Sequence, residues 1–126
     1  VGGVKKTFAG REYVFVDGGM ADNPRYALYK AKYEAMLANK MNQEADTTYT
    51  VAGKCCESGD MLVMDAKLPK AEQGDLLLVS STGAYNYSMS SNYNRLPKLP
   101  VVFVKDGTSR LVVKGETLED LIRQDI

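Results

Sequence analysis

The sequence predicts a mainly β domain, a barrel or a sandwich, with one substantial helix and a short C-terminal helix. Short runs rich in β-branched, aromatic and other apolar residues recur along the chain, and Gly, Pro and Asp turn signals separate them. The length of 126 residues fits one domain that can bury a core of its own. We therefore expect residues 1–126 to form a single β domain.

The predicted elements follow in order along the chain. Asn23 and Pro24 provide a helix N-cap and a first helical residue, and a stretch rich in Ala, Leu, Lys, Glu and Met then predicts a helix over residues 25–41. Asp106-Gly107 predicts a hairpin turn, and Thr117 with Asp120 resembles a capping box that opens the terminal helix. The strands are expected at residues 12–16, 47–52, 61–64, 75–79, 101–104 and 111–113.

The stretch 80–94 matches neither the helical nor the strand period. It is rich in Ser, Tyr and Asn, and we expect a long polar loop. Loops of this length inside a compact domain are often functional.

Composition excludes several classes of function. The chain has 16 basic and 16 acidic residues, so no charge surplus favours nucleic acid, and no apolar run is long enough to cross a membrane. It has no histidine, which excludes Ser-His or Cys-His catalysis and histidine-ligated metals within the chain, and we expect no metal site. Cys55 and Cys56 are adjacent, and as free thiols they suit a reducing cytoplasm.

Three groups of residues are candidates for a functional site. Cys56 and Glu57 place a thiol beside a carboxylate on a Gly-flanked turn, a pairing that can move a proton or hold an ammonium group. Arg25 and Tyr29 share one helix face and can hold a carboxylate. Tyr85 lies in the polar loop, which can cradle a phosphate or a substrate. Each group taken alone is more often a solvated turn, a surface Arg over a Tyr ring, or a polar loop.

Together, the segments that carry these groups resemble the C-terminal domain of diaminopimelate decarboxylases. The resemblance covers nearly the whole chain. The segments are, in order, VDGGM at 16–20, RYALY at 25–29, AGKCCESGD at 52–60, GAYNYSMSSNYN at 83–94 and GETLED at 115–120. Lys54 and Cys55 depart from the usual pattern without removing a residue that has a role, and the Lys54 charge can lower the pKa of a neighbouring thiol.

The resemblance implies a Greek-key-type β domain and a role for each candidate residue. Arg25 and Tyr29 would hold the substrate carboxylate that is not lost. Cys56 would donate or accept a proton near the Schiff-base carbon, and Glu57 would bind the distal ammonium of the substrate, both supplied across a homodimer interface. Tyr85 would bind the phosphate of pyridoxal 5'-phosphate and contribute to the substrate site.

The resemblance also implies a larger enzyme that converts meso-2,6-diaminopimelate to L-lysine and carbon dioxide in the cytoplasm. An N-terminal (β/α)₈ barrel, absent from this chain, would carry the Schiff-base lysine, so we expect the chain alone to be inactive. We also expect an open strand edge near residues 1–16, because strands from outside the chain would complete the sheet. The alternatives are a related decarboxylase acting on ornithine, arginine, carboxynorspermidine or a carrier-bound amino acid, and a free-standing β-barrel binding module.

Overall fold

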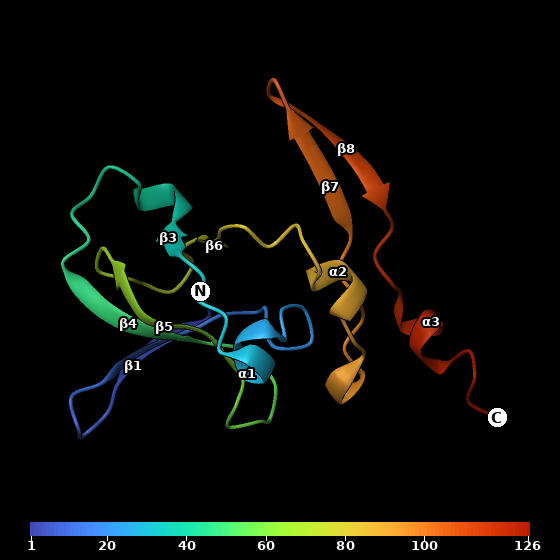
Figure 1. Ribbon diagram of the computed structural model, residues 1–126, viewed down its shortest axis with the longest axis horizontal. Helices are drawn as coiled ribbons and strands as arrows, with labels where there is room; N and C mark the ends of the chain where they lie inside the picture. The colour runs from blue at the N-terminus through green and yellow to red at the C-terminus, as the bar shows by residue number, and fades with distance from the viewer.

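A four-stranded sheet is the largest element of the computed structural model, which describes all residues 1–126 (Figure 1). Its strands are β1 (Gly3–Lys6), β2 (Glu12–Phe15), β4 (Thr47–Ala52) and β5 (Met61–Leu68). They lie in the order β1-β2-β4-β5, with β2 and β4 parallel and the other two pairs antiparallel. Strand β1 is therefore an edge strand, and the expected open edge near the start of the chain is confirmed.

The core lies on this sheet. Val14 of β2 and Val51 of β4 are register partners, and both are fully buried. Burying a side chain of this size stabilises the fold by about 1.5–3 kcal/mol, so the central strand pair anchors the domain. The remaining core side chains are Val16, Leu37, Tyr49, Leu62, Val63, Ala66, Leu68 and Ala71.

The long helix predicted over residues 25–41 is wrong. Helix α1 spans only Arg25–Tyr29. Lys30 then adopts a left-handed backbone with φ 55°, and its N–H donates to the Tyr26 carbonyl, as at a helix C-cap. The helix also begins one residue later than predicted, since Pro24 and not Asn23 is its N-cap, although Asn23 Oδ1 accepts a hydrogen bond of 3.3 Å from the Arg25 N–H.

A strand replaces the second half of the predicted helix. Strand β3 (Ala35–Leu37) pairs antiparallel with β6 (Leu77–Val79) and is followed by a 3-10 helix, η1 (Ala38–Lys40). Leu37 is 1% exposed in the core. Helix propensities differ by less than about 1 kcal/mol per residue, so burial of Leu37 and pairing with a distant strand outweigh them.

The C-terminal third follows its local sequence signals. Strands β7 (Val101–Lys105) and β8 (Thr108–Val113) form a hairpin that stands away from the main sheet (Figure 1). Its turn is Asp106-Gly107 as predicted, with φ values of 50° and 72° that suit a type I′ turn. Helix α3 (Leu118–Ile122) begins at the predicted capping box.

The polar stretch 80–94 contains two short helical turns within the expected loop. Helix α2 spans Asn86–Met89, and a 3-10 helix, η2, spans Tyr93–Arg95. The strand expected at 61–64 extends to Leu68, because β5 continues pairing with the start of β4.

The predicted mainly β fold class is confirmed. Of the two predicted arrangements the sandwich fits, because the three separate sheets do not close into a barrel. None of the helices has the length and apolar character needed to cross a membrane.

A buried carboxylate fastens η1 to the turn before β6. Asp75 Oδ2 accepts a hydrogen bond from the Glu72 N–H and lies 2.8 Å from Lys40 Nζ, while Oδ1 accepts from Asn39 Nδ2. The bond from Lys40, more than any other contact, holds the pKa of Asp75 at about 2. Ionised Asp75 therefore stabilises the fold.

We expect this stabilisation to be complete above pH 3.8, the ordinary pKa of the carboxyl group, and to be lost as the pH falls through about 2. Asp75→Asn should remove this part of the pH dependence and lower the free energy of unfolding near neutral pH by about 1–3 kcal/mol. Glu72→Gln, which changes the exposed partner of the same lysine, should cost less than about 1 kcal/mol. Urea unfolding across this pH range measures both, and an Asp75→Asn profile that matches wild type would contradict the prediction.

Candidate functional site

The first part of the candidate site is an arginine between two tyrosines. Arg25 begins α1, and its guanidinium carbon lies 5.7 Å from the ring centroid of Tyr29 and 4.8 Å from that of Tyr85. Both tyrosines are well exposed, and Arg25 takes part in none of the ion pairs of the chain. A cation without an acidic partner, beside two phenol groups, is suited to bind an anionic ligand.

The second part is the turn that joins β4 to β5. The Gly53 N–H donates to the Asp60 carbonyl across its base, at 2.9 Å. Cys55 is buried, and burial raises the pKa of its thiol, whereas Cys56 and Glu57 are exposed. Of the two adjacent cysteines, Cys56 is therefore the one that a substrate can reach.

Glu57 has a neighbour that the sequence analysis did not single out. The Tyr93 hydroxyl donates to Glu57 Oε2 at 3.4 Å, and burial together with the Glu57 charge raises the pKa of Tyr93. Tyr93 begins η2, which is fastened to the end of the chain where Arg95 binds both carboxylate oxygens of Asp125 at 2.8 and 2.7 Å.

A buried carboxylate fills the inside of the β4–β5 turn. Asp60 is 2% exposed; its Oδ1 accepts from the Met20 N–H and its Oδ2 from the Cys55 N–H, each at 2.6 Å. A Cβ atom built on Gly53 would lie 2.6 Å from the carboxyl carbon, closer than real atoms approach. Position 53 therefore requires glycine while Asp60 holds this place.

The structure thus gathers the five predicted residues into two groups. Arg25, Tyr29 and Tyr85 form one, and Cys56 with Glu57 forms the other. No hydrogen bond or ion pair joins side chains of the two groups within the chain.

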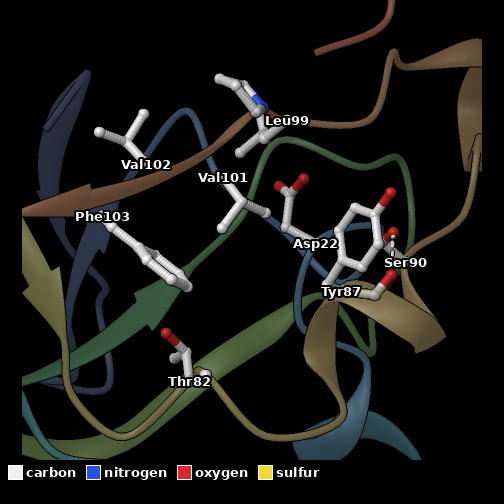
Figure 2. A pocket seen from close by; sticks show the side chains of 10 residues that line it. Asp22, Thr82, Tyr87, Ser90, Leu99, Val101, Val102 and Phe103 are labelled. Atoms are coloured by element: carbon white, nitrogen blue, oxygen red, sulfur yellow. Dashed lines mark hydrogen bonds between the residues drawn. The ribbon is translucent and has the colours of Figure 1, made fainter. Parts of the chain in front are cut away.

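A pocket of about 450 Å³ is a separate feature that contains none of these five residues. Figure 2 shows Val101 and Phe103 of β7 on one side of it and Tyr87 of α2 on the other. Its one charged residue, Asp22, accepts a hydrogen bond of 3.1 Å from the Gly19 N–H, and burial raises the pKa of Asp22. The positive charge of Lys54 lowers the pKa of Asp22 and so opposes the effect of burial.

Sequence reasoning missed Asp60 and Tyr93 as parts of the site. Both residues lie in segments that carry the family resemblance. Asp60 ends the run CESGD at 56–60, and Tyr93 lies in the run SMSSNYN at 88–94. Their partners Met20 and Glu57 are distant in sequence, and no local spacing rule pairs them.

Comparison with known proteins places the chain among enzymes of one kind. A family model described as pyridoxal-dependent decarboxylase, C-terminal sheet domain, matches residues 1–83. The diaminopimelate decarboxylase of Bacillus subtilis (strain 168) is 56% identical over 126 residues, which is 100% of this chain and 29% of that protein.

Two crystal structures of diaminopimelate decarboxylases with L-lysine share the fold. The enzyme from M. jannaschii has a TM-score of 0.91 and 34% identity, covering 100% of this chain and 28% of that one. The enzyme from Helicobacter pylori has a TM-score of 0.85 and 38% identity, covering 98% of this chain and 29% of that one. The chain therefore spans less than a third of the length of these relatives.

We expect Gly53→Ala to lower the free energy of unfolding by about 1–3 kcal/mol, because the added methyl group displaces the Asp60 carboxylate. Gly59→Ala in the same turn is the matched control, since the nearest atoms to its Cβ would lie 3.9 Å away. That control should stay within about 1 kcal/mol of wild type. Thermal or urea unfolding measures both, and equal losses in the two variants would contradict the prediction.

Proposed function

This chain belongs to the pyridoxal-dependent decarboxylases as their C-terminal sheet domain, and from that premise we propose that it serves a diaminopimelate decarboxylase. The reaction would convert meso-2,6-diaminopimelate to L-lysine and carbon dioxide. The L-lysine bound in two related structures supports this assignment. Family membership favours the enzyme domain over a free-standing binding module.

Arg25 between its two tyrosines is the observation that carries the proposal. A substrate with two amino-acid ends needs one carboxylate held while the other is lost. The Arg25 guanidinium has no acidic partner in the chain, so its charge is available for the retained carboxylate, with the Tyr29 hydroxyl beside it. Charge-assisted bonds of this kind fix orientation as well as affinity.

Tyr85 fits the phosphate of pyridoxal 5'-phosphate. Its ring lies 4.8 Å from the Arg25 guanidinium carbon and its side chain is 66% exposed, so a phenol donor sits in a positive environment open to an anion. When bound, the cofactor supplies the chemistry by accepting the electrons that departing carbon dioxide leaves behind. The residues of this chain orient the substrate around it.

Cys56 and Glu57 have complementary roles in this proposal. The exposed Cys56 thiol donates or accepts a proton at the substrate carbon that loses its carboxyl group. The Glu57 carboxylate, held by Tyr93, binds the distal ammonium group. Together with the distal carboxylate that Arg25 would hold, that group makes up the second amino-acid head, which ornithine and arginine lack.

We extend the proposal to a cytoplasmic homodimer in which Cys56 and Glu57 act in the active site of the partner subunit. Three observations support this. The two residues lie on an exposed turn, they make no side-chain bond to the Arg25 group, and the β7–β8 hairpin exposes Phe103 and Val104. Exposed apolar side chains gathered on one element mark protein–protein contacts.

We expect the full-length protein that carries this chain, supplied with pyridoxal phosphate, to release carbon dioxide from meso-diaminopimelate. Its kcat/KM should exceed that for ornithine, arginine or carboxynorspermidine by roughly 10²-fold or more. Glu57→Gln should lower kcat/KM for meso-diaminopimelate, because the distal ammonium loses its ionic partner, and Glu44→Gln on an exposed loop is the control that should leave kcat/KM unchanged. A higher kcat/KM for one of the other amino acids would replace the proposed substrate.

In the same protein we expect Cys56→Ala to lower kcat by roughly 10²–10⁴-fold with a much smaller change in KM, because a proton-transfer group acts mainly on the chemical step. Cys55→Ala removes the neighbouring buried thiol and should keep kcat within about tenfold of wild type. Steady-state kinetics measures both. Wild-type turnover in Cys56→Ala would exclude the assigned role.

A further inference from the structure

The Asp60 carboxylate joins two segments that are distant in sequence. Oδ2 accepts from the Cys55 N–H in the β4–β5 turn, and Oδ1 accepts from the Met20 N–H ahead of α1. Hydrogen bonds to an ionised acceptor are about twice as strong as neutral ones. The bond from Cys55 is buried and the bond from Met20 is partly buried. An unpartnered buried N–H would cost about 1–3 kcal/mol, so each segment is held in place by the other.

The turn is wound around this carboxylate. The Asp60 N–H donates to the Glu57 carbonyl at 3.0 Å, and the Glu57 N–H donates to the Cys55 carbonyl at 2.8 Å. With its base closed between Gly53 and Asp60, the turn carries Cys56 and Glu57 outward while Cys55 points inward. Two of the three hydrogen bonds that the Glu57 carboxylate accepts come from Ser58 and Gly59 of the same turn, so the fold of the turn sets the position of Glu57 and of Cys56 beside it.

The segment on the other side leads directly to Arg25. After Met20, the N–H groups of Asp22 and Asn23 both donate to the Gly19 carbonyl, at 2.9 and 3.0 Å. Asn23 Oδ1 then accepts from the Arg25 N–H. An unbroken series of hydrogen bonds therefore runs from the Asp60 carboxylate to the first residue of α1.

We infer that Asp60 is a positioning residue that sets the placement of Cys56 and Glu57 and, through the Gly19–Asn23 segment, of Arg25. The inference rests on the proposed function for its effect on catalysis, whereas the placement itself does not depend on which reaction takes place. Asp60 touches no substrate in this scheme; it acts through the residues that do.

Kinetics of the full-length protein with pyridoxal phosphate test the effect on catalysis. Asp60→Asn leaves one carbonyl oxygen for two N–H donors, so one of the segments is released. We expect kcat/KM for meso-diaminopimelate to fall roughly 10- to 100-fold, as for a displacement of about 1 Å at a reacting group. Leu68→Ala, a cavity variant at the far end of β5, is the control for lost stability and should keep kcat/KM within about threefold when assayed below its unfolding transition.

A double-mutant cycle separates positioning from a general loss of structure. Because Asp60 acts in part through Cys56, adding Asp60→Asn to Cys56→Ala should lower kcat/KM by clearly less than Asp60→Asn does in the wild-type protein, and the loss that remains reflects Glu57 and Arg25. Multiplication of the two full effects, or an equal loss of kcat/KM in Leu68→Ala, would overturn the inference.

Two measurements decide the placement independently of activity. In the wild-type protein the Met20 and Cys55 amides should be protected from hydrogen exchange, and exchange of either at the rate of an unstructured peptide would overturn the inference even if Asp60→Asn fails to fold.

In folded Asp60→Asn, alkylation of Cys55 by iodoacetamide, resolved from Cys56 by fragment mass spectrometry, should rise at least about tenfold. An unchanged Cys55 rate together with unchanged protection of the Met20 amide in this variant would also overturn it. A protein that decarboxylates none of the tested amino acids would disprove the proposed function, while exchange and alkylation would still decide the placement.

Discussion

The buried carboxylate of Asp60 is the constraint on which the site depends. Asp60 is 2% exposed, and a carboxylate in that environment is tolerated only when donors satisfy it. The backbone must therefore bring the N–H groups of Met20 and Cys55 to it, and glycine must stand at position 53 to leave room. The path of the chain on both sides of β4 follows from that requirement.

The same turn separates two cysteines that are adjacent in sequence. Cys55 faces the Asp60 carboxylate and the interior, where burial raises the pKa of its thiol, while Cys56 faces outward. The sequence alone does not show which of the two thiols is accessible. The path of the backbone decides it, because it turns Cys55 inward and Cys56 outward. The motif match assigned the chemistry to Cys56, and the burial of Cys55 supplies a physical reason for that choice.

Sequence reasoning succeeded where structure is decided locally. The Asp106-Gly107 turn and the Thr117 capping box depend on residues within four positions of one another, and both were predicted. It failed over residues 25–41, where strand β3 forms because Val79 and its neighbours pair with it from a distant part of the chain. Composition favours a helix there, but burial of Leu37 against the sheet is worth more than the summed propensities of a short segment.

The candidate site shows the same division. Arg25 and Tyr29 were paired from helical spacing, and α1, short as it is, keeps that spacing. Tyr85 joins them from a different segment, because its ring packs under the Arg25 guanidinium, and no periodicity in the sequence predicts that contact. Tyr93 reaches Glu57 in the same way, from a 3-10 helix fastened to the chain end through Arg95. The residues proposed to act on a substrate are thus recognisable by motif, whereas the residues that hold them are found only where the fold brings distant segments together.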